Sequence, residues 1–207
     1  MAEANRSSTA QLDEPRQVTG DSIADPGPLG LAAFASTTFV LSCFNADLLD
    51  ASLSAVVLPL ALFYGGLVQL LAGMWEFRKG NTFGATAFSS FGAFWLSFAG
   101  YVRSVAPHLP AAGAHQATGL FLLAWAIFTV YMTVAALKTS GAVLGVFAFL
   151  SLTFILLAVG EFAQSTGITK VGGWFGLVTA VLAWYASFAA VTNATWRRPA
   201  LPTWPRG

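Results

Sequence analysis

The side chains in this sequence that could take part in chemistry are uncharged polar groups placed along long apolar runs. In the first run, Phe34, Thr38 and Asn45 recur at spacings that put them on one face of a helix, and Thr37 stands beside them. Hydroxyl and amide groups can bind an anion weakly enough to release it, whereas fixed cations would trap it. The same groups could instead form hydrogen bonds between helices, which contribute about 0.6 kcal/mol each. The stripe indicates either a pore wall or a helix contact.

A second face of this kind joins Leu150 to Glu161 in another apolar run. A carboxylate at the end of a membrane helix is either solvated at the interface or functional, because a charge inside the membrane is costly. The runs contain no Ser/His/Asp set, metal-binding histidine pair or phosphate loop, and the single Cys43 cannot form an internal disulfide. A nucleophile needs a base within reach. We therefore predict no enzyme activity, no metal site and no cofactor.

Six helices are needed to position these residues. Of 207 residues, 56% are hydrophobic and only 9% are charged, whereas a soluble domain carries about 25% charged residues. A membrane-crossing helix takes about 20 mostly apolar residues, and continuous runs of that length argue against a barrel of short alternating strands. The fold class predicted is an all-α polytopic membrane protein. The six spans are Leu29–Leu49, Ser54–Trp75, Thr82–Val102, Ala117–Leu137, Ala142–Gly160 and Val171–Ala194.

Lysine and arginine are divided unequally between the two sides of these spans. Eight of the ten lie on the side of both termini, and only Arg103 and Lys170 lie on the other. Such an excess marks the cytoplasmic side of a cell membrane. We expect a cytoplasmic tail over residues 1–28, a transport domain over 29–196 and a second cytoplasmic tail over 197–207. A net charge of +1 gives no basic surface for nucleic acid.

The first span begins with an unusual stretch, DPGPLGLAAF. Proline in the first helical turn sacrifices no hydrogen bond, and glycine leaves the backbone closely approachable. Unpaired N–H groups at the positive end of the helix dipole can form a weak anion site, although the stretch could also be only a helix start at the interface. The motif consists of Asp25, Pro26, Gly27, Pro28, Leu29, Gly30 and Leu31.

This motif resembles the N-P-A-P-L-G-L signature of the acetate uptake transporter family, which includes the bacterial succinate–acetate permeases. TTFVLSCFNA is similar to the first helix of that family, and FYGGLVQLLAGMWEFRKGNTFGATAFSSFGAFW is similar to its most distinctive block. SLTFILLAVG and GGWFGL also match. The resemblance extends from Asp25 to the sixth span.

The resemblance implies a hexamer of six-helix subunits in a lipid bilayer, each subunit with its own pore. It implies transport of acetate and similar monocarboxylates, in some members succinate, by an anion channel or a proton symporter. The family pore narrows at a hydrophobic triad whose positions correspond to Phe34, Phe91 and Leu150. Asp25 stands where the signature has Asn, Gly27 where it has Ala, and Phe91 where the triad has Tyr. The missing Tyr hydroxyl puts dicarboxylate transport in doubt.

The position of Phe91 conflicts with the helix periodicity. On an ideal helix Phe91 lies opposite a stripe of Thr82, Thr86 and Ser89, and both faces cannot line one pore. Either the stripe packs against neighbouring helices or subunits, or this helix is irregular. We follow the resemblance and assign Phe91 to the pore.

The resulting interpretation is a carboxylate pore with a dry constriction. Asn45 and Glu161 shape its outer vestibule, Thr37 and Thr38 offer hydroxyls just beyond Phe34, and the Asp25–Leu31 backbone guides the anion at the inner mouth. Two alternatives stay open. One is a channel or carrier for another small solute, such as ammonium or a neutral acid, and the other is a non-transporting membrane scaffold or sensor.

Overall fold

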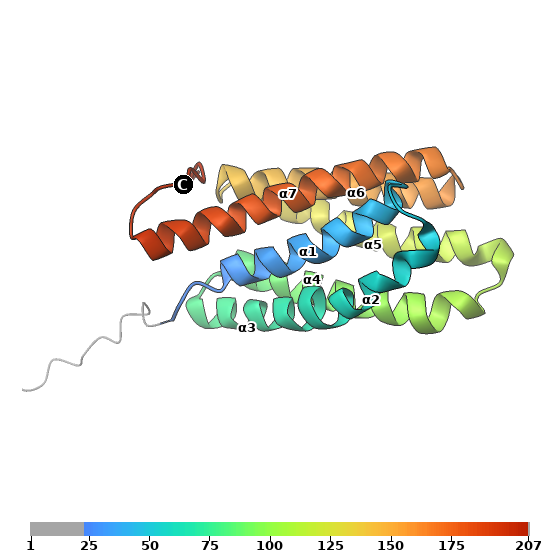
Figure 1. Ribbon diagram of the computed structural model, residues 1–207, viewed down its shortest axis with the longest axis horizontal. Helices are drawn as coiled ribbons and strands as arrows, with labels where there is room; N and C mark the ends of the chain where they lie inside the picture. The colour runs from blue at the N-terminus through green and yellow to red at the C-terminus, as the bar shows by residue number, and fades with distance from the viewer. Residues whose placement is uncertain (1–22, 207) are drawn as a thin grey trace, which may run out of the picture.

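The part of the chain that the structure describes, residues 23–206, forms six helical rods that lie roughly along one axis (Figure 1). In this computed structural model the prediction of six helices in an all-α fold is confirmed. The second rod is composite: it joins a 3₁₀ turn (Ala51–Val56), α2 (Val57–Pro59), a π-helical segment (Leu60–Val68) and α3 (Gln69–Lys79). The other rods are α1 (Gly27–Asn45), α4 (Thr82–Gly100), α5 (Ala111–Ala136), α6 (Gly141–Phe162) and α7 (Thr166–Trp196).

Predicted spans and observed helices differ mainly at their ends. α5 begins at Ala111 rather than Ala117, and α7 begins at Thr166 rather than Val171. A π-helical turn (Tyr101–Val105) prolongs α4. Hydropathy marks only the segment that lipid would surround, whereas backbone hydrogen bonding continues into the polar turns. Five rods are long and apolar enough to cross a bilayer, and α4 falls short because it carries several Ser, Thr and Gly residues.

Polar residues in the turns determine where helices start and stop. The Asn81 side-chain oxygen accepts a hydrogen bond from the Gly84 N–H (3.1 Å), and the Ser140 hydroxyl accepts one from the Val143 N–H (3.2 Å). Both bonds satisfy amide groups that have no partner inside the helix. Gly80 ends α3 with a left-handed φ of 79°, which glycine adopts without steric cost. These short turns hold α3 and α4, and α5 and α6, in antiparallel pairs.

Small residues let the helix backbones approach closely. α7 packs along both α1 and α6, and α3 packs along α4. A Cβ added at Gly173 of α7 would lie 2.5 Å from the carbonyl carbon of Asn45, and one added at Gly73 of α3 would lie 3.0 Å from the Cα of Ser89. Within the stripe on α4, Ser89 thus packs against α3, as in the first of the two options considered above. The opposite face of α4 turns Phe91 into the core, where it is 2% exposed.

The segment after α7 returns to the bundle, although it lies in the predicted C-terminal tail. The Gly141 N–H at the start of α6 donates to the Trp204 carbonyl (2.7 Å), and the Tyr185 hydroxyl donates to the Pro202 carbonyl (2.7 Å). Both ends of the described chain lie at the same end of the bundle (Figure 1). That end is named here the Asp25 end, and the opposite one the Glu161 end.

Candidate functional site

Four cavities follow one another between the Asp25 end and the Glu161 end. They are the Asp25 cavity (about 310 Å³), the constriction cavity (about 20 Å³), the aromatic cavity (about 150 Å³) and the Glu161 cavity (about 420 Å³). Each shares wall residues with the next: Leu31 joins the first two, Phe34 and Leu150 join the middle two, and Asn45 and Glu161 join the last two. The cavities therefore outline one route through the described helical bundle.

The Asp25 cavity is lined by part of the predicted N-terminal motif. Asp25, Gly27, Pro28 and Leu31 stand in its wall. Asp25 Oδ1 accepts a hydrogen bond from the Gly27 N–H (3.1 Å) and forms an ion pair with Lys79 Nζ (2.8 Å). The Asp25 carboxylate thus accepts a hydrogen bond from the first backbone amide of α1. The positive charge of Lys79 balances its negative charge.

The remaining motif residues lie beside this cavity rather than in its wall. Pro26 occupies the position just before α1, and Leu29 is 47% exposed. Gly30 is buried, and a Cβ there would lie 2.7 Å from the Phe88 ring. Glycine at position 30 therefore allows α1 and α4 to approach each other, which is a packing role.

Glu76 is a residue of this cavity that the sequence reasoning missed. It lies in the last turn of α3, lines the Asp25 cavity and is only 1% exposed. Its Oε2 accepts a hydrogen bond from Asn81 Nδ2 (2.8 Å). Hydropathy assigned Glu76 to a polar break between two spans. Nothing in its local sequence indicates that the neighbouring helices enclose it.

The three residues of the predicted hydrophobic triad meet at the constriction. Phe34, Phe91 and Leu150 are 4%, 2% and 3% exposed and line the constriction cavity together. The ring centroids of Phe34 and Phe91 are 5.7 Å apart, and Phe91 also packs edge-on against Phe128 at 5.3 Å. A cavity of about 20 Å³ has room for about one water molecule. The path is therefore narrowest and driest here.

One polar group reaches the constriction. Gln69, at the start of α3, lines the cavity and is 1% exposed, and its Oε1 has no hydrogen-bond partner among the described residues. A buried unsatisfied carbonyl costs about 1–3 kcal/mol. The sequence reasoning treated amides of this kind as helix–helix contacts. The structure gives the Gln69 oxygen no such contact among the described residues.

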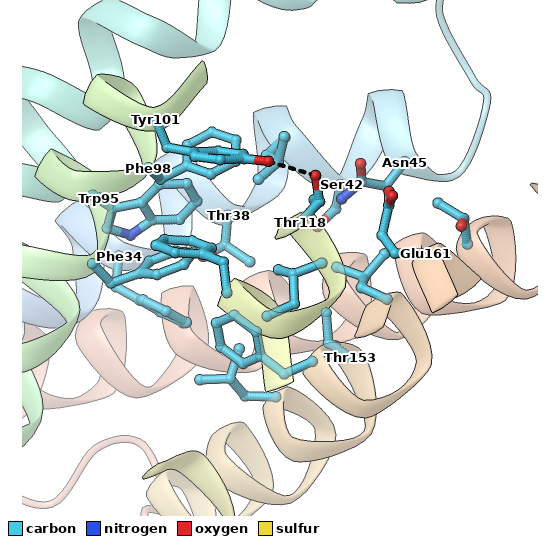
Figure 2. Close-up of a pocket in the computed structure, with 18 residues that line it drawn as sticks. Phe34, Thr38, Ser42, Asn45, Trp95, Phe98, Tyr101, Thr118, Thr153 and Glu161 are labelled. Atoms are coloured by element: carbon cyan, nitrogen blue, oxygen red, sulfur yellow. Dashed lines mark hydrogen bonds between the residues drawn. The ribbon is translucent and has the colours of Figure 1, made fainter. Parts of the chain in front are cut away.

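Seven of the 18 residues that line the wall between the constriction and the Glu161 end are aromatic (Figure 2). Thr38 and Trp95 stand in this wall, and neither the Thr38 hydroxyl nor the Trp95 indole nitrogen has a partner among the described residues. Further along, the Tyr101 hydroxyl and the Thr118 hydroxyl lie 2.7 Å apart. Two buried hydrogen-bond donors without a partner thus belong to the wall of the aromatic cavity, and Glu161 is the only carboxylate among its described lining residues.

Thr37 points away from this route. It is fully buried against the π-helical segment of the second rod, where a Cβ at Gly65 would lie 2.8 Å from the Thr37 Cβ. Its hydroxyl donates to the carbonyl of Ala33 (3.0 Å). The two adjacent threonines therefore face different sides of α1, and Thr38 alone lines a cavity.

Charged and polar side chains gather at the Glu161 cavity. Asn45 and Glu161, the two residues predicted for the vestibule, line both this cavity and the aromatic cavity. Asp47 Oδ2 forms an ion pair with Lys170 Nζ (2.6 Å), and both residues line the Glu161 cavity. His115 also faces this cavity. The Glu161 cavity therefore carries both signs of charge, whereas none of the described residues that line the constriction cavity is charged.

The sequence matches the GPR1/FUN34/yaaH family over residues 9–205. This chain belongs to that family. The predicted resemblance is confirmed, because bacterial succinate–acetate proteins are among the relatives. The succinate-acetate/proton symporter SatP of Escherichia coli K12 is 37% identical over 180 residues, covering 87% of this chain and 95% of that protein. Acetate permease A of Emericella nidulans is 43% identical over 87% of this chain and 65% of its own length.

A solved structure of the GPR1/FUN34/yaaH family has the same fold. It is described as the bacterial acetate channel SatP and matches with a TM-score of 0.82 at 37% identity, covering 87% of this chain and 99% of that one. With five helices among residues 23–206 able to cross a bilayer, the chain is a multi-pass membrane protein. The chain spans 62 to 65% of the length of the four yeast and mould relatives with 39 to 48% identity.

Proposed function

We propose that this protein carries acetate and similar small monocarboxylates across a membrane along the four-cavity route. One observation carries the proposal: a route through the subunit narrows to about 20 Å³ between Phe34, Phe91 and Leu150, in a chain similar to proteins named for acetate transport. An apolar constriction favours a small, weakly hydrated solute. It disfavours ions that must keep their water.

The polar groups near the constriction suit a carboxylate. The Thr38 hydroxyl and the Trp95 indole N–H are unpartnered donors on one side, and an anion that reaches them is held by hydrogen bonds without a fixed cation. The edges of aromatic rings carry partial positive charge and add to this attraction. Binding of this kind is weak enough to permit release. Asn45 and Glu161 shape the vestibule before it.

We assign the Asp25 end to the cytoplasm. The Lys and Arg distribution supports this assignment, because cytoplasmic loops carry the excess of positive residues. The test uses a Cys43→Ser background with a new cysteine at Ala112, which is exposed near the Glu161 end. A membrane-impermeant maleimide should label intact cells carrying Ala112→Cys. A cysteine at Thr139 should react only after permeabilisation. The reverse pattern would invert the assignment.

The oligomer is part of the same proposal. We expect a hexamer with one route in each subunit, as the resemblance implies, and the mass of the purified protein in detergent tests it. A monomer or dimer that transports acetate at full rate would contradict the hexamer. The proposal that the protein transports acetate would still hold in that case.

Acetate flux into sealed liposomes tests the function. The purified protein is reconstituted, and uptake of labelled acetate is measured while the pH gradient and the membrane potential are set separately. Acetate current without proton movement would identify a channel, and strict proton coupling would identify a symporter. No carboxylate flux under any gradient would refute the proposal and favour a scaffold or sensor. Strong competition by ammonium or a neutral acid, with weak competition by other carboxylates, would point to a different solute.

A further inference from the structure

A buried carboxylate stands in the wall of the Asp25 cavity without a role in the route described above. Glu76 is 1% exposed, and the Asn81 side chain is the group that hydrogen-bonds to its Oε2. The cation of this cavity, Lys79, pairs with Asp25 at 2.8 Å. Among the described residues, Glu76 therefore has no ion-pair partner of its own within 4 Å.

The carboxylate of Glu76 lies where two helices begin. Its Oε1 is 3.3 Å from the position of a Cβ at Gly27, at the start of α1, and 3.0 Å from that of a Cβ at Gly84, in the first turn of α4. Helix N-termini attract anions through their free N–H groups and their dipole. At this cavity, the protein's own side chains already use that attraction: Asp25 takes the Gly27 N–H, and Asn81 takes the Gly84 N–H.

The charge balance of the cavity follows from these contacts. Asp25, Glu76 and Lys79 are the charged residues that line it. With all three ionised, the wall carries one net negative charge, and a passing carboxylate meets repulsion where the helix ends alone would have held it. A permeating dicarboxylate carries two negative charges, so this wall repels it more strongly than it repels a monocarboxylate.

We propose that Glu76 is a specificity-determining residue that keeps the Asp25 cavity from retaining a permeating carboxylate and disfavours dicarboxylates. The inference rests on the proposed transport function. Glu76 acts as a tethered anion that occupies the space between two helix ends. A transported monocarboxylate therefore leaves the cavity quickly, because the site that would bind it is already filled.

The Glu76–Asn81 hydrogen bond could equally serve only to join α3 to α4, so the test must separate charge from structure. Glu76→Gln removes the charge and keeps an oxygen that can accept from Asn81. Asn81→Ser breaks the hydrogen bond and keeps both the charge and a capping side chain for α4. The readouts are the apparent KM and maximal rate for acetate, and the ratio of succinate to acetate flux in liposomes.

Glu76→Gln should lower the apparent KM for acetate about threefold or more, lower the maximal rate, and raise the succinate-to-acetate ratio. Asn81→Ser should leave the ratio unchanged. Lys79→Gln, at a side chain that is 35% exposed, should raise the KM and lower the succinate-to-acetate ratio, because it makes the cavity more negative. This variant also keeps the test valid should Glu76→Gln fail to fold.

The inference would be wrong if Glu76→Gln left both the KM for acetate and the succinate-to-acetate ratio unchanged. It would also be wrong if Asn81→Ser shifted them as Glu76→Gln does. In either case the unmodified protein would still transport acetate, and the proposed function would stand. Absence of a KM rise in Lys79→Gln would overturn the inference as well. Absence of acetate flux in the unmodified protein would instead refute the proposed function, and this inference would be refuted with it.

Discussion

Truncating Leu150 to alanine should widen the constriction and relax the selection of substrate by size. Leu150 is 3% exposed and lines both the constriction cavity and the aromatic cavity. The substitution removes three carbon atoms from the wall, so the space of about 20 Å³ at the narrowest point opens directly into the larger cavity beside it. Solutes that the intact constriction excludes should then pass.

Two magnitudes follow from this position. Burial of the three lost carbons contributes about 2.4 kcal/mol, at ~0.8 kcal/mol for each. Because the void joins an existing cavity rather than forming a closed one, we expect a stability loss of about 2 to 3 kcal/mol, at the lower end of the range for buried leucines. A tenfold rise in the flux of succinate relative to acetate would correspond to a barrier change of about 1.4 kcal/mol.

The assay compares labelled acetate and succinate uptake by liposomes that contain equal amounts of folded protein, with thermal unfolding in detergent as the stability measurement. Leu152→Ala is the matched control, because it makes the same truncation on the same helix at a side chain that is 43% exposed. We expect the flux ratio to change in Leu150→Ala alone. An equal proportional change in both fluxes would refute the assignment of Leu150 to the constriction.

Three further predictions concern other parts of the route and the bundle. Phe91→Tyr supplies a hydroxyl at the constriction, and we expect succinate uptake to rise relative to acetate; an unchanged ratio would mean that this position does not select. Asp25→Asn removes the partner of Lys79, so the apparent KM for acetate should fall about threefold (~0.7 kcal/mol); an unchanged KM would leave Asp25 as a cap of α1. Gly173→Ala places a Cβ 2.5 Å from backbone carbon and should cost about 1–3 kcal/mol, seen as a lower Tm. As the control for Gly173→Ala, Gly145→Ala, whose Cβ would lie 3.5 Å from Leu182, should be neutral or stabilising by up to ~1 kcal/mol.

Much of the fold could be predicted because it depends on local properties of the chain. Each membrane span is a continuous apolar run, and a bilayer leaves such a run only one way to satisfy its backbone, which is a helix. The faces that join Phe34 to Asn45 and Leu150 to Glu161 follow from helical periodicity, and the structure puts all four residues on the cavity walls. The position of Phe91 needed the family resemblance, since periodicity alone left its direction undecided.

Other features depend on which helices become neighbours, and only the tertiary structure decided them. Glu76 looked like a solvated residue of a polar break, but α1 and α4 enclose it. Thr37 and Thr38 are adjacent and chemically identical, yet one packs against Gly65 and the other lines the aromatic cavity. The segment that ends near Trp204 looked like a free tail, but its carbonyls cap α6. In each case the outcome is set by contacts between residues far apart in the chain, which periodicity and hydropathy do not contain.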